Sequence, residues 1–329
     1  MNGRFYTRTS IDEDAKSDIW IKLLIMRIIE FIEKFPDEAS CKDRFKTLRD
    51  EAGVTCKKCG TQKQYWLAAK EQYQCSSCGF RTTLRSGTLL QNSHLPYSYW
   101  FIAIHLLTST KKSISALEMK KQLGHKRYRP IWEMMHKLRK RMGESMKEML
   151  LEESVEMDEG FITAINPDAD KDEKRKRGRG SQKKGKVVVM VESKDGDPKN
   201  KSSKRPAKKC GKVKMVVVDA ISGENVKSVT KDNISDQATV ITDGYVSYSE
   251  MSNLVNKHEQ LLVPPKEASK LLPWVHIFIS NAKRLFLNTF HKINTTYLQN
   301  YLDEFCYKAN NRYNQNSLFN SLLNITIKI

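Results

Sequence analysis

The sequence predicts an α/β protein in which a small metal-binding module and a helical region precede a domain with a mixed β-sheet. Three observations support this fold class. Two Cys-x-x-Cys pairs occupy residues 56–78, apolar residues recur at helical spacing over residues 97–142, and short runs rich in Val, Ile and Met follow residue 150. Strands that alternate with longer helices are typical of a sheet covered by helices.

The length and charge balance of the chain limit its number of domains and its class of binding partner. A chain of 329 residues is long enough for two or three domains, and 57 Lys and Arg against 38 Asp and Glu give a net charge of +19. This excess favours a polyanionic partner, with DNA or RNA ahead of an anionic membrane.

The first apolar segment, Ile19 to Phe35, contains Lys22, Arg27 and Glu30, which are too many charges for a membrane span. It also lacks the features of a signal peptide, so we expect a buried amphipathic helix within an N-terminal helical region, residues 1–50. Seven cysteines, an odd number, fit a reducing compartment. We therefore expect a cytoplasmic, nucleoid-associated protein with no membrane partner.

Residues 51–92 are predicted to form a zinc ribbon. Cys56 and Cys59 form one pair and Cys75 and Cys78 the other, with about fifteen residues between the pairs. Each pair can bring two thiolates to one tetrahedral ion, while the glycines that follow, at 60 and 79, suit the tight turns. Four cysteines leave no open coordination position, so the zinc would be structural; a disulfide pair is the alternative.

A helix-turn-helix is predicted for residues 93–150. One helix runs through Leu123, Gly124 makes a turn, and a second helix starts at Pro130, a residue favoured at the first helical position. The second helix has an apolar stripe and a basic face, which suits a helix lying against DNA. A helical hairpin with a solvated charged face is the alternative. The candidate DNA-binding residues are Lys137, Arg139, Lys140 and Arg141.

The second half of the chain carries the candidate catalytic acids. Four strands are predicted, at Val155–Ile162, Lys186–Glu192, Lys214–Ala220 and Thr239–Thr242. Asp158 lies in the first and Asp243 follows the fourth. Two carboxylates about 4 Å apart repel by roughly 4 kcal/mol at an effective dielectric near 20, so a pair requires a cation such as Mg²⁺ or Mn²⁺. Two such ions would serve phosphoryl transfer.

Each aspartate taken alone is more typical of a solvated strand end or a cap than of a catalytic residue. The neighbouring acids, Glu156 and Glu159, are predicted to provide local solvation or to support the metal ligands from outside. Local pattern does not show that Asp158 and Asp243 meet.

Several motifs together resemble one family. The segments "CKKCG", "CSSCGFRTTLRSGTLL", "VEMDEGFI", "VITDGY" and "LPWVHIFISNAKRLFLNTFHKINTTYLQNYLDEFCYK" are similar, in this order, to transposases of the IS1595 insertion-sequence family with an ISXO2-like catalytic domain. The resemblance covers residues from about 34 to about 312. It implies an RNase H-like catalytic domain over residues 151–312, followed by a tail, 313–329.

The resemblance also implies a DDE-type site whose third position is often asparagine. It places Asp158, Asp243 and Asn281 as magnesium ligands and catalytic residues, with Lys283 holding a DNA phosphate. Ile277 stands where the family usually has arginine, and "KANNR" replaces an arginine-rich ending, which removes expected DNA contacts.

If Asn281 is not the third ligand, Asp303 and Glu304 are the nearest acids, although their apolar neighbours favour a packing or solvation role. His276 and His291 flank the "SNAK" motif; lining a DNA channel and simple packing are equally compatible with them.

The expected function is DNA transposition. The zinc ribbon and helix-turn-helix would recognise terminal inverted repeats, and the catalytic domain would hydrolyse a phosphodiester and join the 3′-hydroxyl to target DNA. A homo-multimer on double-stranded DNA is expected. The alternatives are a DNA-binding regulator with an inactive RNase H-like domain and a nuclease of the same fold that cuts without joining.

Overall fold

The computed structural model describes residues 26–165, 184–195, 208–248, 251–261, 271–290 and 293–327. The chain forms two compact units. Residues 1–110 and 311–329 form the first, called here the ribbon unit, and residues 111–310 form the second, the sheet unit. This division differs from the predicted boundary at residue 150. No described helix is long and apolar enough to cross a membrane.

The ribbon unit contains four α-helices among its described residues: α2 (Ile28–Lys34), α3 (Glu38–Ala52), α4 (Tyr97–Ser109) and α11 (Gln315–Ile327). Helix α3 starts at Asp37, which exchanges hydrogen bonds with Ser40 in a capping box. Of the predicted helix from Ile19 to Phe35, residues 19–25 lie outside the described residues, and α2 forms only its end. The predicted tail is not separate, because α11 packs against α3 and α4.

Aromatic rings form the centre of the ribbon unit. The rings of Phe31 and His105 are stacked 4.5 Å apart, and Phe319 contacts Phe31, Phe35 and Phe101. His105 is buried, and burial lowers its pKa. The histidine on this apolar helix is therefore a packed core residue.

The same unit contains a three-stranded antiparallel sheet in the order β1 (Gln64–Leu67), β2 (Gln72–Cys75) and β3 (Arg81–Thr83). A short 3-10 helix, Ala68–Lys70, joins β1 to β2. Tyr73 of β2 is buried and donates a hydrogen bond to Asp50 of α3 at 2.6 Å. One face of this sheet is therefore fixed against α3.

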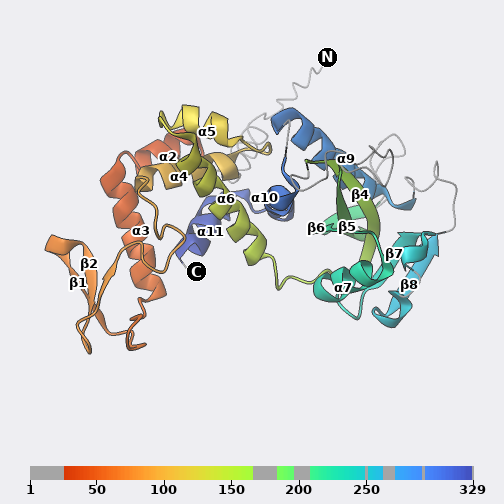
Figure 1. Ribbon diagram of the computed structural model, residues 1–329, viewed down its shortest axis with the longest axis horizontal. Coiled ribbons are helices and arrows are strands. Elements are labelled where there is room, and N and C mark those ends of the chain that lie inside the picture. The colour runs from red at the N-terminus through yellow and green to blue at the C-terminus, as the bar shows by residue number, and fades with distance from the viewer. Residues whose placement is uncertain are drawn as a thin grey trace, which may run out of the picture. The chain divides into compact units, whose positions relative to one another are not determined.

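The sheet unit has five strands in the order β6-β5-β4-β7-β8 (Figure 1). These are β4 (Ser154–Thr163), β5 (Lys184–Asp195), β6 (Lys208–Val218), β7 (Thr239–Asp243) and β8 (Lys257–Leu261). The first three in the chain pair antiparallel, whereas β7 and β8 join in parallel. This mixed order is that of an RNase H-like sheet, as the resemblance implies.

The four predicted strands are confirmed, and β5 and β6 are longer than predicted. They continue to the pairs Lys194↔Lys209 and Asp195↔Lys208. The segments that join β4 to β5 and β5 to β6, residues 166–183 and 196–207, lie outside the described residues. Strand β8 was not predicted, because "KHEQL" has almost no apolar residues.

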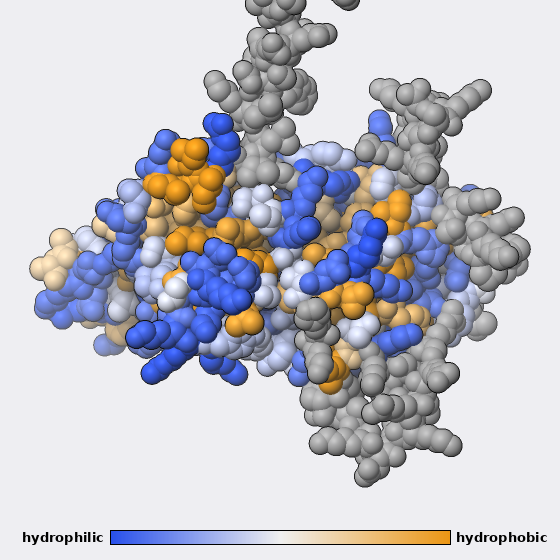
Figure 2. All heavy atoms as spheres, turned by 90° about the horizontal axis from the view of Figure 1, so that it is seen from above, coloured by the Kyte–Doolittle hydropathy of each residue, from blue (hydrophilic) through white to orange (hydrophobic). Residues whose placement is uncertain are grey.

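Helices cover both faces of the sheet. On β5, Val188 and Met190 pack in the cluster that includes α7 (Gly223–Asn233). Val187, Val189 and Val191 point the other way, into the cluster with α9 (Pro273–Thr289) and α10 (Thr295–Asn310). This period of two places a core on each side of the sheet. Figure 2 shows one face of the whole molecule, on which hydrophilic side chains alternate with apolar patches.

The predicted helix-turn-helix consists of α5 (Ala116–Gln122) and α6 (Tyr128–Ser145). Gly124 has a φ of +61°, a left-handed conformation that glycine adopts easily, and makes the predicted turn. Helix α6 packs against α10 with its apolar stripe buried. This packing explains why both helices belong to the sheet unit.

Two side-chain amides cover the outer edge of β6. Asn310 of α10 accepts from the backbone N–H of Val213 at 2.7 Å and donates to its carbonyl at 2.9 Å. Gln299 accepts from the N–H of Val217 at 2.8 Å and donates to the carbonyl of Met215 at 2.9 Å. The amides stand in for a neighbouring strand, so this edge is closed to further pairing.

Candidate active site and zinc site

The four cysteines of the ribbon come together around one point. Their Sγ atoms lie within 4.8 Å of one another, and the pairs Cys56–Cys78 and Cys59–Cys75 are 3.6 and 3.5 Å apart. All four are free thiols. Four sulfurs around zinc, each at about 2.3 Å, would be separated by roughly 3.8 Å, so the cluster fits a tetrahedral Zn²⁺.

The local backbone explains this arrangement. Gly60 and Gly79 donate to the carbonyls of Cys56 and Cys75 at 2.9 and 3.0 Å and have φ angles of +74° and +67°. Burial raises the pKa of Cys75, but the N–H groups of Cys78 and Ser77, together with the thiols of Cys59 and Cys78, outweigh it and lower the pKa to about 6. Cys75 therefore favours the thiolate, the form that binds zinc. At Cys59 a backbone N–H lowers the pKa, but hydrogen bonds with the other thiols outweigh it and raise the pKa.

A second cluster lies in the sheet unit. Carboxylate oxygens of Asp158, Glu159 and Asp243 lie within 4.8 Å of one another. Strands β4 and β7 are parallel neighbours in which Met157 pairs with Thr242, so the following residues, Asp158 and Asp243, lie side by side. The structure thus brings together the two aspartates that the sequence analysis singled out, and adds Glu159.

The cluster is unfavourable for three negative charges. The Asp158 side chain is only 14% exposed, and burial, together with the charges of Glu159 and Asp243, raises its pKa to about 7. The Tyr248 hydroxyl donates to Glu159 at 3.0 Å, and burial beside these acids raises the pKa of Tyr248. Carboxylate oxygens at this spacing are the donor set that Mg²⁺ or Mn²⁺ prefers.

Glu156 positions a helix beside this cluster. It is fully buried and accepts hydrogen bonds from the backbone N–H groups of Trp274 and Val275 at 2.8 and 3.0 Å. A carboxylate at a helix N-terminus is favoured by the helix dipole, so Glu156 fixes the start of α9 to β4. One residue further, His276 Nδ1 lies 3.6 Å from Asp158 Oδ2. Burial lowers the pKa of His276.

From the sequence, Glu159 was expected only to provide local solvation or to support the metal ligands from outside, and His276 either to line a DNA channel or to pack. The contact of His276 with Asp158 depends on α9, which is far away in the sequence. Only the "WVH" motif pointed to His276, and His291 lies outside the described residues.

Asn281 is exposed on α9, and its amide oxygen accepts from Arg284 at 2.7 Å. Five residues separate it from His276, a rotation of about 140° around the helix, whereas Lys283 lies almost two turns on and on the same side as His276. The positive charge of Lys283 lowers the pKa of His276, although burial is the larger cause. Lys283, but not Asn281, therefore shares the face that meets Asp158.

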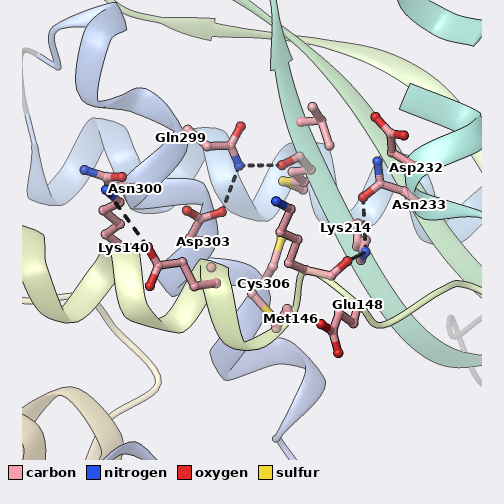
Figure 3. Close-up of a pocket in the computed structure, with 15 residues that line it drawn as sticks. Lys140, Met146, Glu148, Lys214, Asp232, Asn233, Gln299, Asn300, Asp303 and Cys306 are labelled. Carbon is pink, nitrogen blue, oxygen red and sulfur yellow. Dashed lines mark hydrogen bonds and ion pairs between the residues drawn. The ribbon is translucent and has the colours of Figure 1, made fainter. Parts of the chain in front are cut away.

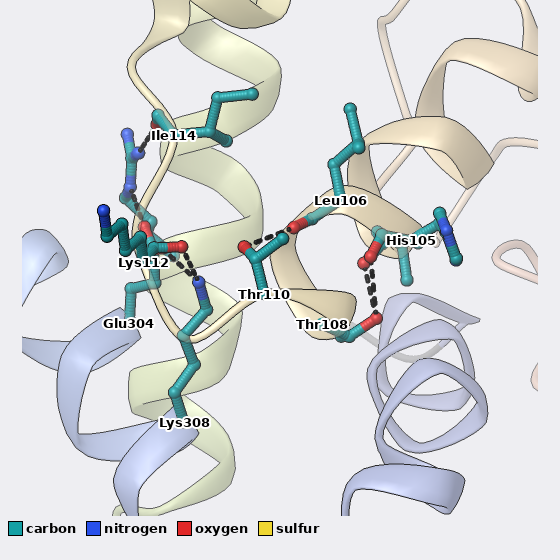
Figure 4. A network of polar contacts seen from close by, with 10 residues as sticks. His105, Leu106, Thr108, Thr110, Lys112, Ile114, Glu304 and Lys308 are labelled. Atoms are coloured by element: carbon teal, nitrogen blue, oxygen red, sulfur yellow. Dashed lines mark hydrogen bonds and ion pairs between the residues drawn. The ribbon is translucent and has the colours of Figure 1, made fainter. Parts of the chain in front are cut away.

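Arg139 lies inside the protein and not on its surface. It was predicted to contact DNA from an exposed helix face, but its side chain is fully buried. The guanidinium donates to Glu304 of α10 at 2.7 Å and to the carbonyl of Ile114 at 3.1 Å (Figure 4). Lys308 completes the network, with Glu304 at 3.1 Å and the carbonyl of Lys112 at 2.9 Å. A buried carboxylate on α10 holds Arg139 inside.

The other predicted DNA contacts on α6 are less available than the sequence suggests. Lys137 is half-buried, and Arg141 bonds to Glu144 at 2.9 Å. Lys140 is exposed, with Nζ 4.0 Å from the Glu144 carboxylate. One acid, Glu144, thus offsets part of the positive charge at the end of this helix.

The two alternative acids lie outside the carboxylate cluster. Glu304 is held by Arg139 and Lys308. Asp303 accepts from Gln299 at 2.8 Å, and burial raises its pKa to about 6. Both acids thus have structural roles in α10, in keeping with the packing role that the sequence favoured.

A cavity of about 840 Å³ lies where α6, β6, α7 and α10 meet (Figure 3). Lys214 is buried there and donates to the carbonyl of Lys147 at 3.3 Å and to Asn233 at 3.1 Å. None of the clustered carboxylates lines this cavity. It is therefore separate from the candidate active site.

Comparisons with known families match two segments. Residues 150–310 match the ISXO2-like transposase domain, and residues 36–81 match the transposase zinc-ribbon domain of IS1595. Together they span the zinc cluster and the carboxylate cluster. No curated protein matches the chain.

Three solved structures show weaker similarity. The Mos1 strand transfer complex is 11% identical, covers 70% of this chain and 78% of its own, and has a TM-score of 0.27. The Mos1 transposase paired-end complex with left transposon end has 11% identity, coverages of 70% and 81%, and a TM-score of 0.25. A pre-cleavage Mos1 transpososome has 10% identity, coverages of 73% and 82%, and a TM-score of 0.25.

Proposed function

Because the chain belongs to the IS1595 family of DNA transposases, we propose that it cuts insertion-sequence ends and joins them to target DNA by metal-dependent phosphoryl transfer at Asp158 and Asp243. The observation that carries this proposal is the cluster of three carboxylates on adjacent strands of an RNase H-like sheet. Three acids so close together in a largely buried site call for a cation.

The residues of the cluster have distinct proposed tasks. Asp158 and Asp243 hold the divalent ion, with Glu159 as an additional carboxylate oriented by the Tyr248 hydroxyl. Bound there, Mg²⁺ or Mn²⁺ supplies the positive charge that stabilises the attacking and leaving oxygens of an in-line displacement. His276, whose Nδ1 lies 3.6 Å from Asp158 Oδ2, is proposed to limit the rotation of the Asp158 carboxylate.

Helix α9 supplies the proposed DNA and ligand contacts. Lys283, on the same side of α9 as His276, binds a phosphate of the strand that is cut. Asn281 remains the proposed third ligand, and for this role its amide must leave Arg284 and α9 must turn so that Asn281 joins the face that meets Asp158. Replacing Asn281 by aspartate should preserve nicking, whereas alanine should abolish it; full activity of the alanine variant would remove Asn281 from the site.

The reaction has two proposed steps. Water first attacks the phosphorus at the element end and the 3′-oxygen leaves; this 3′-hydroxyl then attacks a target phosphorus, whose own 3′-oxygen leaves. Both steps exchange one P–O bond for another, so no covalent enzyme intermediate is needed. Since two ends must be joined together, the active form is proposed to be a homo-multimer on the terminal inverted repeats.

A strand-transfer assay with the native element ends tests this proposal. Asp158→Ala and Asp243→Ala should each lower Mg²⁺-dependent joining by at least about 10³-fold, since a bound metal contributes several kcal/mol. Asp236→Ala, at an exposed acid of the same unit, is the matched control and should keep activity. Joining that survives loss of both aspartates would reject the proposal. Sequence-specific binding without nicking would favour a DNA-binding regulator.

A further inference from the structure

The outer face of the three-stranded sheet in the ribbon unit carries an ordered set of side chains. In the register of the sheet, Tyr65 is opposite Gln74, which is opposite Arg81. The next row on this face is Leu67, Gln72 and Thr83. Because directly paired residues point to the same side of a sheet, these two rows form one surface.

The opposite face of the same sheet is already occupied. Tyr73 bonds to Asp50 of α3, and Lys46 of α3 lies over the ring of Trp66 at 4.9 Å. Thr82, in the same row, is buried. The sheet is therefore held rigidly by α3, and its outer face is the side left for a partner.

The outer face is polar and contains no acid. Tyr65 is 48% exposed, Arg81 and Thr83 are exposed, and the two glutamines are half-buried. Arg81 Nε donates to Gln74 Oε1 at 3.3 Å, which orders both side chains. A guanidinium, two amides and a hydroxyl are the groups that form hydrogen bonds with base edges in DNA.

Cations lie in the same ribbon. Lys57 and Lys58 are in the first zinc knuckle and Lys63 precedes β1; all three are exposed. Over the described parts of the chain, no carboxylate lies within ion-pair distance of Lys58, Lys63 or Arg81. On helix α6, by contrast, Arg139 is buried and Glu144 lies near both Lys140 and Arg141. The ribbon thus carries exposed cations, free of carboxylate partners among the described residues, that can meet a polyanion.

We propose that this face enters the major groove of duplex DNA and reads base edges, with Arg81 and Gln74 as the central specificity-determining residues. The inference rests on the proposed function, in which duplex DNA is the substrate. Tyr65 and Arg81 are two strand spacings apart, about 10 Å, which suits a major groove about 12 Å wide. The two rows are about 7 Å apart along the strands, or roughly two base-pair steps.

The test uses the zinc-loaded full chain without Mg²⁺ and a pool of duplexes with randomised base pairs. The wild type should enrich a motif. Arg81→Ala with Gln74→Ala should lose preference at two or three adjacent positions and should bind the selected duplex more weakly, by roughly 5- to 150-fold for each bidentate pair of hydrogen bonds to a base that is removed. Lys231→Ala with Gln237→Ala removes one positive charge and one amide from exposed positions of the sheet unit and should leave the motif unchanged.

Lys58→Ala with Lys63→Ala should act differently. These lysines are proposed to bind phosphates, so the motif should be kept while the slope of log affinity against log salt falls by about 0.9 for each phosphate that is no longer neutralised. Zinc content is measured for every variant. If the double variant at 81 and 74 loses zinc, Arg81→Gln alone replaces it and should show the same change of motif.

The inference is overturned if a zinc-loaded Arg81 variant keeps both motif and affinity, if the wild type enriches no motif, or if single-stranded DNA competes better than duplex. A change of motif in Lys140→Ala instead would assign the reading to α6. A wild type that selects a motif but never cuts would count against the proposed function alone. Cutting with an unchanged motif in the Arg81 variant would count against this inference alone.

Discussion

Replacing Arg139 by alanine should destabilise the sheet unit. Burial alone would raise the pKa of its partner Glu304, but the charges of Lys308 and Arg139 outweigh burial and lower the pKa from 4.5 to about 2. That difference corresponds to about 3 kcal/mol of stability, and breaking a buried ion pair from one side typically costs about 3–5 kcal/mol. Because Lys308 remains next to Glu304, we expect about 3 kcal/mol for Arg139→Ala.

Hydrogen exchange of the zinc-loaded full chain measures this effect locally. Amides of α6 and α10 that exchange through opening of the unit should exchange about 150-fold faster in Arg139→Ala, the equivalent of about 3 kcal/mol. Lys140→Ala is the matched control: it removes an exposed cation one residue away, so its effect should stay within about 0.5 kcal/mol. Protein without DNA is used, so that binding does not contribute.

The pH dependence provides an independent check. Glu304 has a lowered pKa in the folded state, so its contribution is present above about pH 4.5 and is lost as the pH falls towards 2. The triple variant Arg139→Met, Glu304→Met, Lys308→Met should recover most of the lost stability, because none of the three charges of the network is left buried alone. Unchanged exchange in Arg139→Ala, together with weaker DNA binding, would refute this reasoning and return Arg139 to the DNA surface.

Three further predictions concern the two metal sites and the edge of the sheet. Because the pKa of Asp158 is raised to about 7, the free energy of unfolding of the metal-free protein should fall by up to about 4 kcal/mol as the pH rises from about 4 to about 7. Urea unfolding measures this dependence on pH, and Asp158→Asn or saturating Mg²⁺ should flatten it. Cys75→Ser should release zinc, measured with a colorimetric chelator, and should expose the ribbon to protease while the sheet unit stays protected; retained zinc would contradict the four-cysteine site. Gln299→Ala with Asn310→Ala should speed hydrogen exchange of the Val213 and Val217 backbone amides and promote aggregation, measured by light scattering. Unchanged exchange would show that the side chains of Gln299 and Asn310 do not close the edge of β6.

Much of the catalytic sheet could be predicted because four of its strands have a recognisable local composition. The runs around Val155, Val188, Val216 and Val240 are dense in β-branched residues, as strands buried on both faces usually are. Strand β8 could not be found this way, because an edge strand with little buried surface does not need such residues. Its place is set by pairing with β7.

Only part of the candidate site could be predicted from the sequence, because several partners of its residues lie on distant elements. Helical periodicity identified the buried stripe of α6 correctly but placed Arg139 on the solvent face, since its partner Glu304 lies on a distant helix. The same limit applies to His276, which meets Asp158 only through the packing of α9 against β4. Local patterns give the periodicity of one helix or strand. They do not show which residues of a distant helix or strand contact it.

The composition of the ribbon unit has a consequence for protein synthesis. Helix α11 follows the entire sheet unit in the chain, yet Phe319 fills the aromatic centre next to Phe31 and Phe101, and Leu89 donates to the carbonyl of Thr326 at 2.9 Å. A ribosome therefore makes the first part of the ribbon unit before the sheet unit, and α11 only after it. A premature stop codon or frameshift inside the sheet unit should leave both units incomplete, so truncated copies of the gene should not yield a fully packed DNA-binding fragment that could compete with the intact protein.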